Sequence, residues 1–231
     1  MGSVHDGGMD VSAVLFDLDS TLCTHPTARS DALAAAFERA GVDPFCTLAE
    51  LRTAVEAIGE TASMPYRTYR ACADLAASAG LDRETGVAVA AALLAERPSR
   101  GAELTAGAER VLSRLDERYA LALVTNGGPD TQDPKLDALG ITDYFETVVL
   151  AGFDTASKPD PEPFERALGS LDVEPSRAVY VGNSPAHDVA GAHAAGLEAV
   201  WVRPSPSATA NGHAPAWTVD TLTELLPPPW E

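Results

Sequence analysis

Lysine is scarce in this sequence, and basic residues as a whole are outnumbered. Only Lys135 and Lys158 are lysines among 16 basic residues, whereas Asp and Glu number 34 and the formal net charge is −18. Such a charge repels polyanions, so we do not expect nucleic acid as a partner. Salt relieves the self-repulsion, because the Debye length falls to about 3 Å near 1 M. The composition therefore favours a salt-adapted, halophilic protein over an ordinary acidic bacterial one.

Paired cysteines and long apolar runs are also missing. Cys23, Cys46 and Cys72 are odd in number and form no CxxC pair, which argues against a disulfide framework and against a zinc site. No stretch reaches the roughly 18 apolar residues of a membrane span. The start of the chain, Met1 to Asp10, lacks the basic and apolar pattern of a signal peptide, and Met1 to Met9 is interpreted as a loose leader. We expect a cytoplasmic protein with no membrane association and no obligatory protein partner.

Short apolar segments alternate with helix-length ones along most of the chain. The expected strands are Val11 to Phe16, Leu121 to Val124, Thr147 to Leu150, Ala178 to Val181 and Ala199 to Val202. The expected helices between them are Ala106 to Arg118, Pro129 to Leu139, Pro161 to Leu168 and Pro185 to Ala195. Buried parallel strands read as continuous apolar runs. The pattern predicts an α/β fold, a parallel sheet sandwiched by helices.

The alternation stops in one long segment, from about Thr27 to Arg97. There the chain is expected to form four amphipathic helices, with breaks near Gly41 to Pro44, Gly59 to Pro65 and Gly80 to Asp82. We therefore expect an all-helical domain, residues 25–99, inserted into a catalytic core of residues 10–24 and 100–231. Near the end, Arg203 to Pro215 is expected to be a surface loop before a short helix around Asp220 to Leu226.

Two carboxylates, Asp17 and Asp19, follow the first expected strand. Open α/β sheets bind ligands at the carboxyl ends of their strands. Alternation along an extended strand would point both acids the same way, and two acids so close require a cation, a shared proton or full solvation. Asp17 is then a candidate nucleophile and Asp19 a candidate acid and base. A solvated turn or a helix cap is the alternative.

Three further groups stand near the ends of other expected strands. Thr125 and Asn126 can offer a hydroxyl and backbone amides to a phosphoryl oxygen, although either can equally cap the next helix. Lys158 can supply a compact positive charge beside Asp17, unless it is an exposed loop lysine. Asn183 and Asp188 carry oxygens that suit Mg²⁺, although Asp188 can instead be a first-turn helix acid.

Taken together, these motifs resemble the haloacid dehalogenase superfamily over Val11 to Val202. The resemblance rests on Asp17, Asp19 and Thr21 as the first motif, Thr125 as the second, Lys158 as the third, and Asn183 with Asp188 as the fourth. It also includes the run Thr125, Asn126, Gly127, Gln132, Lys135 and Leu136, followed by Tyr144 and Phe145.

The resemblance implies a Rossmann-like core, a type-one cap that selects the substrate, and a Mg²⁺-dependent phosphatase acting on a small phosphorylated metabolite. Asp17 would carry the phosphoryl group, Asp19 would act as acid and base, and Thr125, Asn126 and Lys158 would bind the phosphate. The metal would be held by Asp17, the Asp19 backbone carbonyl, Asn183 and Asp188. These roles are expectations from the family.

One position departs from the family pattern, because Asn183 stands where an aspartate is usual. We expect weaker metal binding in consequence. A 2-haloacid dehalogenase-like reaction is disfavoured by Asp19, and phosphonate hydrolysis by the lack of any lysine between Thr27 and Arg97. A phosphosugar mutase and a catalytically idle binding module of the same fold remain the alternatives.

Overall fold

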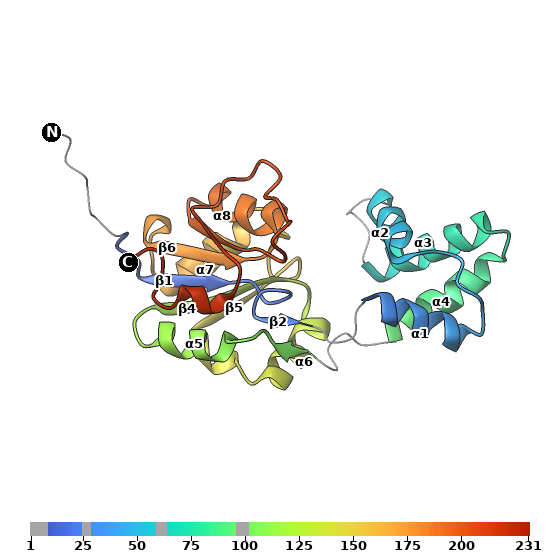
Figure 1. Cartoon of the computed structure of the whole chain (residues 1–231), viewed down its shortest axis with the longest axis horizontal. Coiled ribbons are helices and arrows are strands. Elements are labelled where there is room, and N and C mark those ends of the chain that lie inside the picture. The colour runs from blue at the N-terminus through green and yellow to red at the C-terminus, as the bar shows by residue number, and fades with distance from the viewer. Residues whose placement is uncertain (1–8, 25–28, 59–63, 96–101) are drawn as a thin grey trace. The chain divides into compact units, whose positions relative to one another are not determined.

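The computed structural model describes residues 9–24, 29–58, 64–95 and 102–231. The chain forms two compact units that divide within residues 25–28 and 96–101. We call residues 9–24 and 102–231 the core unit, and residues 29–58 and 64–95 the helical unit (Figure 1). The expected boundaries at 24/25 and 99/100 and the first eight residues of the expected leader, Met1 to Met9, fall on residues that the structure does not describe. Met9 is described and is not loose, because it packs against the core and its amide donates to the Trp230 carbonyl at 3.1 Å.

A sheet of six parallel strands forms the centre of the core unit, in the order β5-β4-β1-β6-β7-β8. The strands are β1 (Ala13–Phe16), β4 (Ala120–Asn126), β5 (Thr147–Ala151), β6 (Ala178–Gly182), β7 (Glu198–Val202) and β8 (Trp217–Val219). The five strands expected from the sequence are present and parallel. The α/β fold class is therefore confirmed.

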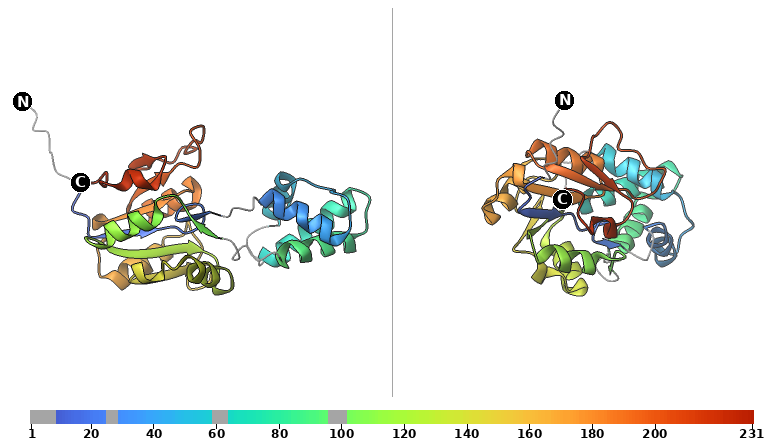
Figure 2. Two further views of the ribbon diagram at one scale, coloured as in Figure 1. Left: turned by 60° about the horizontal axis from the view of Figure 1, so that its bottom comes forward. Right: turned by 60° about the vertical axis from the view of Figure 1, so that its left-hand side comes forward.

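Both faces of the sheet are covered by helices (Figure 2). Alternate residues of each strand face opposite sides: Phe16 packs with α5 (Ala108–Asp116) and α6 (Pro129–Leu139), whereas Leu15 packs with α7 (Glu162–Leu171) and α8 (Ala190–Ala194). Both residues are fully buried. The sheet is thus held from both sides, and its strand ends are fixed points on which side chains can be placed.

Several elements differ from the expectations. β8 was not expected, and it extends the sheet beside β7 where the sequence shows only three weakly patterned residues. A two-stranded antiparallel ribbon joins β2 (Cys23–Thr24) to β3 (Glu103–Leu104). The helix expected over Pro185 to Ala195 begins as a wide π-helical turn, Pro185–Val189, before α8. The last helix is a single 3₁₀ turn, Leu222–Leu225; two further 3₁₀ turns lie at Thr142–Tyr144 and Pro175–Arg177.

The helical unit contains α1 (Arg29–Ala40), α2 (Leu48–Ala57), α3 (Met64–Ser78) and α4 (Arg83–Ala95). Gly41 and Gly80, at two of the expected breaks, have positive φ angles that side chains disfavour. Thr47 and Glu50 form a capping box that starts α2. The buried residues of the unit include Leu33, Phe37, Leu51, Cys72 and Val89.

None of the helices in the described ranges is both long enough and apolar enough to cross a membrane.

Candidate active site

The first motif directly follows β1, at the carboxyl end of the central sheet. β1 ends at Phe16, and Ser20 adopts a left-handed φ of 66°, so the chain turns directly after Asp17. Thr21 is fully buried and its hydroxyl donates to Asp17 Oδ2 at 3.1 Å. Asp19 therefore lies beyond the strand, and the alternation of side chains along a strand does not determine where its carboxylate points. The two carboxylates are instead held by two different lysines.

Lys158 lies at the centre of a buried polar cluster. Its Nζ is 2.8 Å from Asp17 Oδ1 and 2.7 Å from Asp188 Oδ1, and it also contacts the Tyr180 hydroxyl at 2.7 Å and the Val124 carbonyl at 3.0 Å. Only 3% of Lys158 is exposed. The interpretation of Lys158 as an exposed loop lysine is therefore wrong. One ammonium group bridges the first and fourth motifs.

Burial and charge determine the protonation states in this cluster. Desolvation acts to lower the pKa of Lys158, but the charges of Asp17 and Asp188 outweigh it and raise that pKa. Desolvation raises the pKa of Asp17 to about 6 against the opposing effect of Lys158. Burial also raises the pKa of Tyr180 well above its usual value. Lys158 and Tyr180 therefore keep their protons. Further positive charge beside Asp17 would lower the pKa of Asp17 and favour its ionised form.

The second motif ends β4. Thr125 is 1% exposed, and its hydroxyl oxygen accepts from Gln132 Nε2 at 2.8 Å. The Asn126 side chain binds the Lys158 backbone at both ends, since Nδ2 donates to the carbonyl at 3.2 Å and Oδ1 accepts from the amide at 2.9 Å. Gly128 caps α6, so the interpretation of Thr125 or Asn126 as a helix cap is wrong. The Asn126 side chain positions the segment that carries Lys158.

The fourth motif brings Asn183 and Asp188 to the same edge. Asp188 lies in the first turn of the π-helical segment Pro185–Val189, as the alternative interpretation expected. It is also only 2% exposed, with its Oδ2 accepting from the Ser184 amide at 2.8 Å and its Oδ1 bound to Lys158. Gly182 makes room, because a Cβ there would lie 2.5 Å from Asp188 Cγ. Asn183 is partly buried, and its Oδ1 is 3.4 Å from the Thr21 hydroxyl.

The oxygens at this edge are of the kind that bind Mg²⁺, which prefers carboxylate and carbonyl ligands. Within the described residues, no three acidic, histidine or cysteine side chains gather closely enough to hold a metal by themselves. A cation would therefore also need the neutral oxygens of Asn183 or of the Asp19 backbone. Three carboxylates (Asp17, Asp19, Asp188) face two lysines here, so a cation also fits the charge balance.

Lys135, which the sequence presented only as part of the family resemblance, is the second buried lysine. Its Nζ lies 2.7 Å from both carboxylate oxygens of Asp19, and the residue is 6% exposed. Both lysines of the chain are therefore buried at one site, Lys158 paired with two acids and Lys135 with one. The scarcity that singled out Lys158 applied equally to Lys135. Nothing in the sequence indicated Tyr180, an apparently ordinary residue of an apolar strand.

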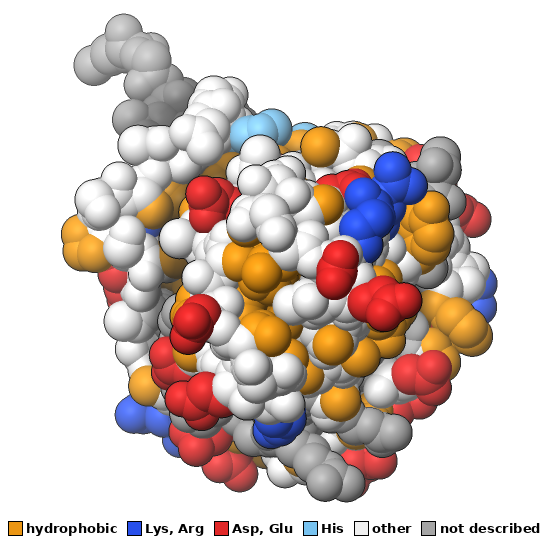
Figure 3. Space-filling view, turned by 90° about the vertical axis from the view of Figure 1, so that its right-hand side faces the viewer, with side chains coloured by type: hydrophobic (Ala, Val, Ile, Leu, Met, Phe, Trp, Pro, Cys, Tyr) orange, Lys and Arg blue, Asp and Glu red, His pale blue; other side chains and the backbone are white. Residues whose placement is uncertain are grey.

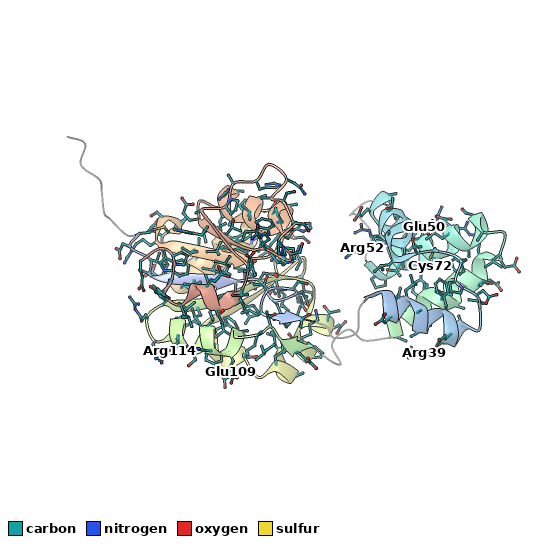
Figure 4. The ribbon with its side chains drawn as sticks, in the orientation of Figure 1. Arg39, Glu50, Arg52, Cys72, Glu109 and Arg114 are labelled. Atoms are coloured by element: carbon teal, nitrogen blue, oxygen red, sulfur yellow. The ribbon has the colours of Figure 1, made fainter. Side chains whose placement is uncertain are left out.

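Two arginines of the helical unit have partners within that unit. Arg67 donates twice to the Val55 carbonyl, and Arg70 pairs with Asp74 at 2.8 Å. Arg52 is exposed and lies at the edge of the unit, whereas Cys72 lies among its helices (Figure 4). The side chain of Arg29 is outside the described residues.

Comparisons with known proteins found a matching family and several relatives. Residues 11–196 match the haloacid dehalogenase-like hydrolase family. The chain is 33% identical, over 93% of its length and 97% of the relative's, to ribulose-1,5-bisphosphate 5-phosphatase of Halopiger xanaduensis. It is 45% identical to phosphoserine phosphatase of Thermus thermophilus over 41% of its own length, a match that spans only 39% of that protein.

The fold also matches solved structures. The crystal structure of the hydrolase YfnB from Bacillus subtilis, bound to magnesium, matches with a TM-score of 0.73 at 22% identity, over 93% of this chain and 96% of that one. At that identity the likeness concerns the fold.

Proposed function

The chain belongs to the haloacid dehalogenase-like hydrolase family, and we propose that it is a Mg²⁺-dependent phosphatase that hydrolyses a small phosphorylated metabolite through an aspartyl-phosphate on Asp17. One observation carries the proposal: Asp17 is a buried carboxylate whose Oδ1 is held 2.8 Å from the Lys158 ammonium, which is itself anchored to Asp188. A buried carboxylate aligned by a fixed cation is suited to nucleophilic attack on an anionic phosphoryl group.

The chain's own groups account for both chemical steps. An Asp17 carboxylate oxygen attacks phosphorus while the bond to the leaving oxygen breaks, and Asp19 gives that oxygen its proton. Asp19 then takes a proton from water, which attacks the aspartyl-phosphate and releases phosphate. Lys158 and the Thr125 hydroxyl contribute positive charge and a donor beside the phosphoryl oxygens.

Mg²⁺ fits the donor set of this edge, and Asp17, Asp188, Asn183 and the Asp19 backbone carbonyl would hold it. When bound, the cation would offset the negative charge shared by the phosphate and the carboxylates. The raised pKa of Asp17, about 6, supports this assignment, because added positive charge favours the ionised nucleophile. The neutral amide of Asn183 makes the site weaker for metal than a further carboxylate would.

The relatives support a substrate class. One relative matched over most of both chains is a ribulose-1,5-bisphosphate 5-phosphatase, and another, from Streptomyces hygroscopicus, is a validoxylamine A 7′-phosphate phosphatase, 31% identical over 91% of this chain. Both are named for the phosphate esters of small molecules. A sugar phosphate or a similar small phosphomonoester is therefore the substrate that we propose.

An idle binding module is the second candidate, and the Asn183 departure is the observation that favours it. A phosphosugar mutase would share Asp17 and Asp19 but would retain the phosphate on its product. Release of inorganic phosphate separates both from the phosphatase.

We propose further that the protein works in a salt-rich cytoplasm. The net charge of −18 supports this, and acidic side chains are spread over the face shown in Figure 3 instead of forming one patch. A surface of this kind gives no attraction to nucleic acid or to an anionic membrane.

The decisive experiment measures Mg²⁺-dependent phosphate release from para-nitrophenyl phosphate and from sugar phosphates by the purified protein and its Asp17→Asn variant. The variant should fall below about a thousandth of wild-type kcat/KM, a loss of about 4 kcal/mol in transition-state stabilisation. Asp116→Asn, an exposed acid on α5, is the matched control and should leave turnover unchanged. Wild-type turnover no higher than that of Asp17→Asn would refute the phosphatase and favour the idle module.

A further inference from the structure

Helix α6 sends two buried side chains to Asp19. Gln132 and Lys135 lie three residues apart, and so on the same face of the helix. Lys135 Nζ is 2.7 Å from each Asp19 carboxylate oxygen, and Gln132 Nε2 is 3.1 Å from Oδ2. The exposed fractions of Gln132 and Lys135 are 1% and 6%. The partly exposed Asp19 carboxylate is thus bound by two buried side chains.

The orientation of Gln132 is determined by its neighbours. Asp19 Oδ2 and the Asn126 carbonyl, at 3.1 and 2.9 Å from Nε2, are both acceptors, so only the NH₂ end can face them. Within the described part of the chain, Gln132 Oε1 has no hydrogen-bond partner. A buried acceptor left unpaired is unfavourable. The contacts at Nε2 are therefore the ones that this residue is placed to make.

The same amide also touches the second motif. Gln132 Nε2 is 2.8 Å from the Thr125 hydroxyl oxygen. Because that oxygen accepts from Gln132, its own hydrogen is directed elsewhere and can be donated to a phosphoryl oxygen. Gly127 lies against Gln132, where a Cβ would be 3.1 Å from Nε2. Gln132 thus links Asp19 to Thr125.

We propose that Lys135 and Gln132 are positioning residues that hold the Asp19 carboxylate and the Thr125 hydroxyl in register, so that α6 controls the proton-transfer steps. The proposal rests on the proposed phosphatase function. A lysine suits this place because its compact ammonium has three donors and can lie between both oxygens of one carboxylate, whereas the planar guanidinium of arginine needs a larger space. The chain uses lysine at only one other position.

The test follows how turnover depends on the leaving group. In Lys135→Met, which keeps the length of the side chain and removes the charge, kcat/KM should fall by about tenfold or more for alkyl phosphates and by less than about twofold for para-nitrophenyl phosphate, whose leaving group needs little protonation. Across a series of phosphate esters, the plot of log kcat/KM against leaving-group pKa should steepen. In an Asp19→Asn background the same substitution should leave the slope unchanged, because Lys135 acts through Asp19.

Leu136→Ala is the matched control, since Leu136 is the adjacent buried residue of α6 and packs in the apolar core. It should lower thermal stability without changing the slope. If Lys135→Met does not fold, Lys135→Gln replaces it. Equal losses for aryl and alkyl esters, or an unchanged slope, would overturn the positioning role.

A second readout needs no turnover. Crystal structures of the wild type and Lys135→Met should differ in the place of the Asp19 carboxylate, and an unmoved Asp19 would overturn the proposal even if the protein proves not to be a phosphatase. Loss of all activity in Asp17→Asn alongside an unmoved Asp19 in Lys135→Met would reject the positioning role while retaining the phosphatase.

Discussion

The core unit and the helical unit differ in what they bury. In the core unit the buried polar side chains are Asp17, Thr21, Thr125, Gln132, Lys135, Lys158 and Asp188, whereas among the described residues of the helical unit Thr68 alone is of this kind. Those of the core unit gather at one edge of the sheet and bind one another. Buried charge is costly even when paired. The difference indicates that the core unit carries its polar interior for chemistry, while the interior of the helical unit is built for packing.

Helices of the helical unit pack very closely against one another. Gly86 on α4 lies against α3, where a Cβ would fall 2.2 Å from the Cys72 carbonyl oxygen. Burial raises the pKa of the Cys72 thiol to about 12, so it stays neutral. Close helix approach, not charge, defines this interior.

The largest effect should come from removing the cation of the core unit. Lys158→Met leaves Asp17 and Asp188 buried without their shared partner, and we expect the free energy of unfolding in EDTA to fall by about 3 kcal/mol. Added Mg²⁺ should restore part of the loss. Chemical denaturation of the variant, with and without Mg²⁺, measures both effects.

Its control is Arg114→Met, which removes an exposed ion pair with Glu117 at 3.2 Å. Such pairs contribute about 0–1 kcal/mol, so the change should be small. Equal effects from the two substitutions would mean that the buried cluster is not special.

The corresponding test in the helical unit is Gly86→Ala. The added methyl group meets the rigid backbone of α3, so we expect a loss of about 2 kcal/mol from overpacking. Gly169→Ala on α7 has open space around the new Cβ and should instead stabilise by about 0.5–1 kcal/mol through helix propensity. Thermal and urea unfolding of both variants check this, and a stabilised Gly86→Ala protein would contradict the close approach.

A smaller effect is expected at the edge that we propose as the metal site. Asn183→Asp should lower the Mg²⁺ concentration for half-maximal activity by about tenfold, or about 1.4 kcal/mol, because a charged oxygen replaces a neutral one. The apo protein should be less stable, since another acid joins Asp17 and Asp188. Asn211→Asp, on an exposed loop, is the control for added charge. Unchanged Mg²⁺ dependence together with unchanged apo melting would mean that Asn183 does not face the metal.

The smallest effect is expected from added salt, and it should stabilise both units. Because the net charge is −18, raising KCl from low to molar concentration should stabilise the protein by about 1 kcal/mol, which raises Tm by roughly 2–4 °C. Trehalose at matched osmolality, which does not screen charge, controls for general solute effects. A Tm that stays flat in KCl would reject the halophilic interpretation.

The sequence by itself determined the strand and helix alternation, the parallel sheet and the strand ends that carry Asp17, Thr125 and Asn183. These follow from local apolar patterning, which states which residues must be buried and where each strand stops. The helix breaks at Gly41 and Gly80 could also be predicted from the sequence, because glycine tolerates the backbone conformation that ends a helix.

Only the tertiary structure decided which partners the polar groups take. It joined Lys158 to Asp188 and Asp17, gave Lys135 to Asp19, and turned the Asn126 side chain toward the Lys158 backbone. It also brought the Tyr180 hydroxyl into contact with Lys158 Nζ and added β8 to the sheet edge. These contacts join residues that are distant in the chain, and periodicity carries no information about which of several buried donors and acceptors will meet.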